Sequence, residues 1–359
     1  MSVRLKAAIV TVITCRWTAL AAQQPAPVPT VTVAGVAFAQ YGYSLNADSS
    51  IAGYGHQNNF DVTRTFVHVL GHFSDGISTR VTFDVDGRKA SSNQLSLRLA
   101  YAFVSWQPNA RGPLTWKLGL MHTPWNEFEE SVWDYRMQGK SVLDRDGYTT
   151  TSDYGAGVDG SWDHERINMQ AGVYNGEGST NPLGDAGKDA EARVSVRLAE
   201  SDLAGRVGGL RLSAYADIGT ANGGAPRRRF LGMMSYRSRT ITLAALIAAT
   251  QDSVAPNAPN QKGLVASVFG VYNVPRTRVA LLARVDSYDP DTDLSSDVPN
   301  TAANLGVNCQ TRVIAGVSYL VSPHLRVLAD VDLLSVSNGA TNLFDRTRQM
   351  VYFHTEFKF

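Results

Sequence analysis

Apolar and polar residues alternate along most of this chain, and the alternation limits the folds open to it more than any other feature. Residues 79–86 read Thr-Arg-Val-Thr-Phe-Asp-Val-Asp, and residues 190–198 and 325–333 follow the same pattern. Successive side chains of an extended strand point to opposite faces, whereas a helix would scatter these charges around its axis. The pattern therefore predicts strands that have one apolar and one polar face.

The final stretch of the chain, residues 350–359, shows how such strands would be joined. It reads Met-Val-Tyr-Phe-His-Thr-Glu-Phe-Lys-Phe and ends on the bare aromatic Phe359. A strand with no polar tail behind it must pair on both edges or leave backbone groups open. Pairing with the first strand would remove both edges and close the sheet into a barrel. An ordinary core strand at the end of a chain is the alternative.

The alternating unit recurs through the chain after residue 30, and we count 16 copies of about ten residues each, as in transmembrane barrels. The mean hydropathy is -0.14. The sequence has no run of about 20 apolar residues, which excludes a membrane protein built from helices. The strands are predicted to begin near Thr30, Asp61, Ile77, Leu95, Leu114, Asp153, Ile167, Asp189, Leu210, Arg228, Ile241, Gln261, Arg278, Gln310, Leu325 and Gln349.

The connectors between these strands fall into two classes. Those after odd strands average about 15 residues and those after even strands about 5, which is the pattern of outer-membrane barrels with long outer loops and short turns. A soluble sandwich has no reason to sort its connections this way. The sequence therefore predicts an all-β fold, a 16-stranded antiparallel transmembrane β-barrel with short periplasmic turns and long outer loops.

The chain is expected to divide into a leader and one barrel domain. Residues 1–22 resemble a secretory signal, with basic residues before an apolar run and the small residues Ala19 and Ala21 at a cleavage site. Residues 23–29 are predicted to be a short lead-in. Residues 30–359 are predicted to form the barrel domain, with a constriction loop inserted at about residues 122–152.

The predicted constriction loop is the longest connector and is rich in both acidic and aromatic residues. Trp125, Phe128, Trp133 and Tyr135 indicate that part of it packs against other protein. We expect it to lie inside the barrel and narrow the pore, and a loop folded over the outer mouth is the alternative. The candidate constriction residues are Glu127, Glu129, Glu130, Asp134, Arg136 and Lys140.

A barrel of 16 strands is too wide for side chains to fill, so its lumen is expected to hold water. Basic residues on the wall, facing an acidic loop, would set up a transverse field and pass ions of both signs. For any single arginine, an ion pair within the wall is the more common role. The strand phase places on the wall Arg64, Arg80, Arg98, Lys117, Arg193, Arg197, Arg211, Arg284, Arg312 and Arg326.

The sequence carries no enzyme signature, so we expect no catalytic, cofactor-binding or metal-binding residues and no cofactor, and we expect that the chain is not an enzyme. A net charge of +1 argues against a nucleic-acid partner. Two rivals to a channel stay open. A Ser-His pair on adjacent strands would favour a barrel-borne enzyme, and a fully plugged lumen would favour a non-conducting barrel for adhesion or assembly.

Three motifs resemble the phosphate-selective porin O and P family, in the broad sense of 16-stranded bacterial porins. They are Leu-Gly-Leu-Met-His-Thr-Pro-Trp at residues 118–125, Val-Tyr-Asn-Gly-Glu-Gly at residues 173–178, and Lys-Asp-Ala-Glu-Ala-Arg at residues 188–193, together with the terminal Phe359. The resemblance covers most of the chain from about Asp61 onward.

This resemblance implies a homotrimeric channel in the bacterial outer membrane, in contact with its lipids and open to passive diffusion of small hydrophilic solutes and ions. Members of the family that select anions use a ladder of lumen arginines with lysines at the constriction. The predicted wall has arginines on the required face, so anions such as phosphate are candidate solutes. The constriction loop here has an excess of carboxylates where an anion site would favour basic residues.

Overall fold

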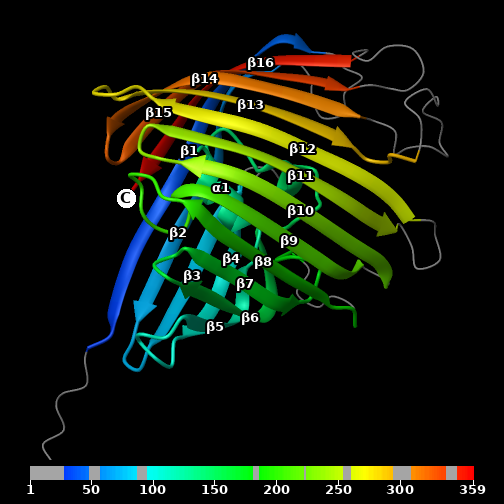
Figure 1. Ribbon diagram of the computed structural model, residues 1–359. Helices are drawn as coiled ribbons and strands as arrows, with labels where there is room; N and C mark the ends of the chain where they lie inside the picture. Colours follow the sequence, from blue (N-terminus) through cyan, green and yellow to red (C-terminus); the bar gives the residue numbers. More distant parts are fainter. Residues whose placement is uncertain are drawn as a thin grey trace, which may run out of the picture.

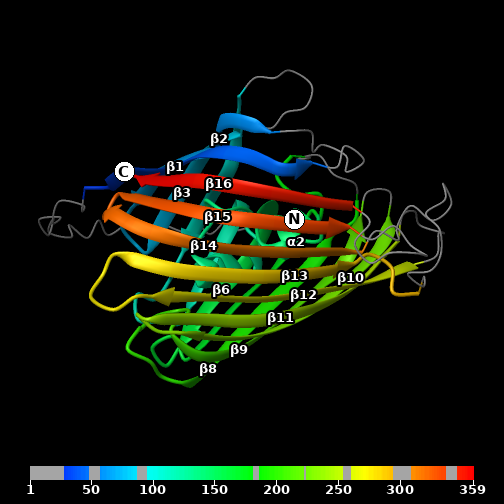
Figure 2. The ribbon, with the colours of Figure 1, turned by 90° about the horizontal axis from the view of Figure 1, so that it is seen from above.

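The computed structural model describes residues 28–47, 57–86, 95–180, 186–221, 224–253, 260–293, 309–336 and 346–359. The predicted signal peptide and most of the lead-in lie outside these residues. The described chain is a closed antiparallel barrel of 16 strands (Figures 1 and 2), which confirms the predicted fold class. In chain order the elements are β1 (Thr30–Ala47), β2 (Asn58–His72), β3 (Ile77–Asp86), β4 (Ser96–Trp106), β5 (Leu114–His122), α1 (Asn126–Trp133), α2 (Val142–Arg145), β6 (Ser152–Trp162), β7 (Ile167–Tyr174), β8 (Asp189–Ala199), β9 (Gly209–Ala221), β10 (Ala225–Arg237), β11 (Ile241–Ser253), β12 (Asn260–Asn273), β13 (Val279–Asp289), β14 (Gln310–Ser322), β15 (Leu325–Val336) and β16 (Arg346–Lys358).

The strands begin within three residues of the predicted positions. The largest differences are at β2, β10 and β16, which start at Asn58, Ala225 and Arg346, earlier than Asp61, Arg228 and Gln349. Strands β9 and β10 pair up to Ala221 opposite Ala225, so only residues 222–224 connect them. The alternation of apolar and polar residues does not predict these earlier starts, because backbone pairing continues beyond the apolar part of each strand.

Pairing of the first and last strands closes the barrel. Strand β1 pairs with β16 from Val36 opposite Lys358 onward. Beyond that register, Gly35 N donates to Phe359 O at 2.8 Å and Phe359 N donates to Gly35 O at 3.0 Å. Each strand thus has a neighbour on both edges, so the backbone groups within the bilayer are paired without water.

The outer surface of the barrel is apolar. Large side chains on many strands face outward and stay accessible, among them Val33 (61%), Leu118 (61%) and Val268 (59%). Neither of the two described helices has the length and apolar character needed to cross a bilayer. An exposed apolar surface of this extent fits contact with lipid.

The barrel interior holds the segment between β5 and β6, residues 123–151, which we call the inserted segment. Its side chains Trp125, Phe128, Trp133 and Leu143 are almost fully buried, and they form one apolar core with inward side chains of β9 to β15. Those inward side chains include Leu231, Met233, Leu246, Val265, Phe269, Leu282, Ile314 and Leu328. The inner face of this part of the wall carries many apolar side chains, unlike the water-filled lumen that the sequence predicts, because it packs against protein.

We predict that Gly119→Ala destabilises the barrel by about 1–3 kcal/mol. Gly119 lies in β5 with φ +127°, and a Cβ there would meet Ala102 O at 2.4 Å. The matched control is Gly232→Ala in β10, where a Cβ meets nothing within 4 Å. The measurement is the urea midpoint of unfolding in detergent micelles. Equal midpoints for the two variants would show that a side chain at position 119 causes no strain.

Candidate functional site

Helix α1 is amphipathic and divides the barrel interior. Phe128 and Val132 are fully buried on the side that packs against the wall. Glu127, Glu130 and Ser131 line a cavity on the other side. Residues three and four apart share one helix face, so this spacing gives α1 one apolar face and one acidic face.

Arginines of the wall hold the inserted segment by its backbone. Four of them donate hydrogen bonds to carbonyl oxygens of this segment: Arg193 to Pro124 (3.0 Å), Arg326 to Asp134 (2.8 Å), Arg237 to Ser131 and Arg229 to Tyr148. Ser131 and Asp134 lie at the C-terminal end of α1, where helix carbonyls lack intrahelical partners and carry partial negative charge. The guanidinium groups thus stabilise the end of the helix and fix its position.

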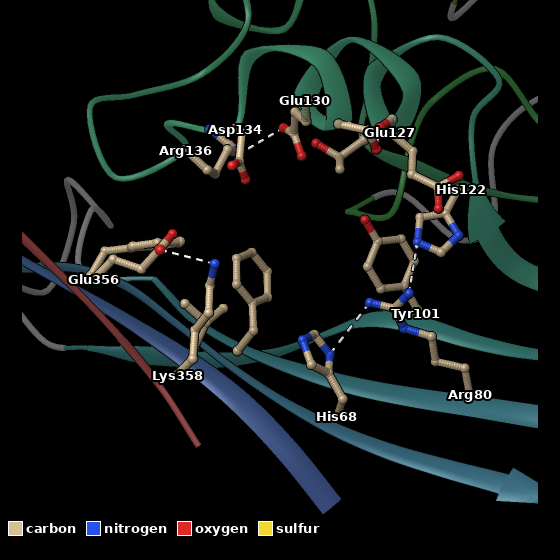
Figure 3. Close-up of a pocket in the computed structure, with 15 residues that line it drawn as sticks. His68, Arg80, Tyr101, His122, Glu127, Glu130, Asp134, Arg136, Glu356 and Lys358 are labelled. Atoms are coloured by element: carbon tan, nitrogen blue, oxygen red, sulfur yellow. Dashed lines mark hydrogen bonds and ion pairs between the residues drawn. The ribbon is translucent and has the colours of Figure 1, made fainter. Parts of the chain in front are cut away.

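A cavity of about 320 Å³, which we call the main cavity, lies between α1 and the inward faces of β1 to β4 and β16. Figure 3 shows Glu127, Glu130 and Asp134 on one side of it and His68, Arg80 and Lys358 on the other. Two smaller cavities of about 140 and 90 Å³ share lining residues with it. We call the three cavities together the gap.

Charges of both signs line the gap in equal number among the described residues. The six cationic side chains are Arg64, Arg80, Arg98, Arg136, Lys140 and Lys358, and the six acidic ones are Glu127, Glu130, Asp134, Asp144, Glu177 and Glu356. The acidic group belongs mostly to the inserted segment and the arginines of the wall to β2, β3 and β4. A field therefore runs across the gap from the wall to the segment.

The predicted wall residues separate into two groups. Arg64, Arg80 and Arg98 reach the gap. The fully buried Asp84 accepts from Arg64 Nη2 at 2.8 Å and forms an ion pair with Arg98 Nη2 at 2.7 Å. A buried carboxylate shared by two guanidinium groups fixes both of them and leaves a net positive charge at this part of the wall.

The other predicted wall residues do not line the gap, although Arg326 lies within ion-pair distance of two acids that do, Asp134 at 3.5 Å and Glu356 at 3.8 Å. Arg193, Arg284 and Arg326 contact aromatic rings of the inserted segment, at 4.3 Å from Phe128, 5.3 Å from Trp133 and 5.0 Å from Tyr135. Lys117 pairs with Asp159 and Arg312 with Asp332 inside the wall. Arg197 and Arg211 donate to carbonyls of the short turns, those of His164 and of Gly208.

The predicted constriction residues also differ in their surroundings. Arg136 Nε lies 2.7 Å from Glu130, and Lys140 Nζ lies 3.0 Å from Asp144. Glu127 accepts from Arg206 at 3.2 Å. Burial acts against the Glu127 carboxylate, but its neighbours His122, Arg206 and Lys117 lower its pKa. Of the four predicted carboxylates, Glu129 is fully buried and does not line the gap.

Sequence reasoning missed several residues of the gap and its supports. Lys358 lies on the inward face of β16, where the strand phase would have found it. Tyr101 lines the main cavity from β4 on the same face as Arg98 but one bulge further along, where pairing with β3 shifts its register. Arg206 lies in the connector between β8 and β9, so no periodicity could have placed it beside Glu127.

Solved structures with the same barrel are outer-membrane proteins. OmpT of Vibrio cholerae aligns over 94% of this chain and 99% of its own, with TM-score 0.62 and 13% identity. An anion-selective porin from Comamonas acidovorans aligns over 92% and 100%, and OmpF of Salmonella typhi over 92% and 97%, both with TM-score 0.62 and 13% identity. The fold is that of outer-membrane porins. The apolar belt and this fold place the chain in the outer membrane.

No protein-family model and no curated protein matches this chain. The resemblance to the phosphate-selective porin O and P family is therefore supported only at the level of the porin fold. At 13% identity the solved structures carry no further assignment of solute.

The expectation that the chain is not an enzyme needs correction. The similar structures include OmpT, an outer membrane protein of Vibrio cholerae, and one fold can host both transport and catalysis, so the fold gives no ground to exclude catalysis. The structure also places His72 Nδ1 3.3 Å from Ser78 Oγ on the neighbouring strand, the kind of pair that favours a barrel-borne enzyme. The pair is exposed, and among the described residues no carboxylate is paired with His72. To exclude catalysis from the sequence alone is wrong.

Glu129 of α1 is fully buried, and only one of its two carboxyl oxygens has a hydrogen-bond partner among the described residues. Its Oε2 accepts a hydrogen bond from Trp125 Nε1 at 2.8 Å, and its Oε1 has no partner among the described residues. Burial raises the pKa of Glu129 from 4.5 to about 7, although Arg284 and the Trp125 hydrogen bond act in the opposite direction. Packing of the inserted segment against the wall, which we call its docked state, therefore favours the protonated form of Glu129.

We predict that docking of the inserted segment weakens as the pH rises. Because the pKa of Glu129 is higher in the docked state, its contribution is fully present below pH 4.5 and is lost as the pH rises to about 7; it amounts to about 3 kcal/mol. Glu129→Gln should abolish this pH dependence. The control is Glu200→Gln, which changes a side chain that is 85% exposed and should leave the pH dependence intact. Amide hydrogen exchange of α1 at pH 5 and pH 8, corrected for intrinsic rates, measures it. Identical pH profiles for Glu129→Gln and the wild type would refute it.

Proposed function

We propose that this chain is a passive diffusion pore for small hydrophilic solutes and ions, with the gap as its narrowest part. The observation that carries the proposal is the open space between the acidic face of α1 and the basic inward face of β2 to β4. A plugged barrel would have the inserted segment packed on all sides. In this structure the inserted segment packs against β9 to β15, and charged side chains line the space on its opposite side.

The chemistry of the gap supports transport without turnover. Charges on both sides replace part of the hydration shell of a passing ion, and the low-dielectric wall strengthens their field. A solute that is both small and polar aligns its dipole with this field, whereas an apolar solute must displace ordered water from it. The size of the gap then sets the size of the solute.

The balance of charge bears on which ions pass. Equal numbers of cationic and acidic groups line the gap, so we propose a general pore without strong preference for either sign. The anion-selective porin from Comamonas acidovorans has the same fold, and anions such as phosphate remain candidate solutes. The ion pairs of Arg64 and Arg98 with Asp84 reduce the positive charge that a phosphate would meet.

We also propose that the pore is a homotrimer in contact with outer-membrane lipid. One of the solved structures with this fold is the trimer form of OmpT of Vibrio cholerae, which aligns over 93% of this chain at 12% identity. The apolar outer surface supplies area both for lipid and for other protomers.

We predict that the double variant Glu130→Gln and Asp134→Asn shifts the zero-current potential toward chloride selectivity. Both side chains line the main cavity from the inserted segment. The chloride to potassium permeability ratio should rise by at least about fivefold, the factor that matches the roughly 1 kcal/mol of a single unit charge at 4 Å in water. The measurement uses the purified protein in a planar bilayer across a tenfold KCl gradient.

Two controls make this experiment decisive. Glu200→Gln removes a carboxylate at the turn end of the barrel, where the side chain is 85% exposed, and should leave the potential unchanged. An unchanged potential in the double variant would show that the gap does not control ion passage. A wild-type protein that conducts no KCl current would refute the pore itself.

A further inference from the structure

Among the described residues, one cation of the main cavity has no acidic partner. The cavity is lined by three cationic side chains, Arg80, Arg136 and Lys358. Arg136 Nε lies 2.7 Å from Glu130, and Lys358 Nζ lies 2.9 Å from Glu356. Among the described residues, no carboxylate lies within ion-pair distance of Arg80. Its charge is therefore available to an anion that enters the cavity.

Neutral groups hold the Arg80 guanidinium in place. Arg80 Nε donates to Thr82 Oγ1 at 3.1 Å, and its two terminal nitrogens lie 3.1 Å from His122 Nε2 and 3.4 Å from His68 Nδ1. Both imidazole nitrogens must be unprotonated to accept these bonds. The ring of Tyr101 lies 4.7 Å from the guanidinium carbon and supports one of its faces.

Within the described part of the chain, this arrangement leaves hydrogen-bond donors free. A guanidinium has five N–H groups, and the three contacts of Arg80 use one on each nitrogen. One N–H on each terminal nitrogen remains, and these two donors can bind an oxyanion. A guanidinium with its orientation fixed loses little entropy when it binds a carboxylate.

Apolar and aromatic side chains line part of the cavity wall beside Arg80. Val36, Phe38 and Phe66 line it from β1 and β2, and Phe38 is 4% exposed. Figure 3 shows His68, Arg80 and Tyr101 together on this side of the cavity, away from the acidic residues of α1. A volume of about 320 Å³ is at the lower end of small-molecule pockets, so it has room for a single ring with a polar substituent.

From these contacts we propose that the main cavity binds small aromatic carboxylic acids, with the carboxylate on Arg80 and the ring against Phe38 and Phe66. This inference rests on the proposed pore function and names a class of solute for it. The acidic face of α1, with Glu127, Glu130 and Asp134, lies across the cavity. It repels a second negative charge, which favours monocarboxylates over dianions.

The test measures KCl current through the purified full-length protein in a planar bilayer, with benzoate, acetate or benzyl alcohol added. Benzoate should reduce the current in a saturable way. Acetate lacks the ring and benzyl alcohol lacks the charge, so each should need about a tenfold higher concentration for the same effect. Equal effects of benzoate and acetate would overturn the assignment of the ring contacts.

Variants locate the binding. Arg80→Gln should raise the half-blocking concentration of benzoate about tenfold, and Arg80→Lys, which keeps the charge but loses the planar fork, about threefold. Phe66→Ala should weaken the effect of benzoate but not that of acetate. Arg98→Gln is the matched control, because it removes a guanidinium group from the next strand that is already paired with Asp84. This variant should change benzoate block by less than Arg80→Lys does.

The outcomes separate this inference from the pore proposal. A wild-type protein that conducts KCl but is insensitive to benzoate would overturn the inference and leave the pore intact. Benzoate block that is unchanged in both Arg80 variants would overturn the role of Arg80. A wild-type protein without KCl current would overturn the pore, and the solute class with it.

Discussion

The structure depends on one constraint, which is that backbone groups in a bilayer have no water to bond. Closure of β1 against β16 meets it, since it gives every strand two paired edges. The side chains are then free to differ between the two faces. The outer face becomes uniformly apolar, while the inner face can hold charges, aromatic rings or a packed segment of the same chain.

Placement of the inserted segment makes the interior asymmetric. Its aromatic side chains pack on the apolar inner face of β9 to β15, and hydrophobic burial alone would let it slide along that face. The arginines that bond the carbonyls of Pro124, Ser131 and Asp134 fix its position. The acidic face of α1 is thereby held opposite β2 to β4. Packing on one side of the barrel thus creates the gap on the other.

Arginines that look alike in the sequence have different roles for the same reason. Arg80 and Arg193 both stand on the polar face of an alternating strand. Arg193 is buried beneath the inserted segment, where it bonds Pro124 and covers the Phe128 ring. Arg80 lies on the open side and keeps donors for a solute. Strand phase predicts that both point inward, but only the position of the segment separates an anchor from a binding group.

The sequence by itself determined the strand number, the strand order around the barrel and the face of each strand that meets lipid, because these follow from local alternation and from pairing of neighbours. It also indicated that residues 122–152 would pack. Only the tertiary structure decided which wall the segment packs on and which charges remain in the gap. Those outcomes depend on contacts between residues as distant as Asp134 and Arg326, and no periodicity in a single chain encodes such contacts.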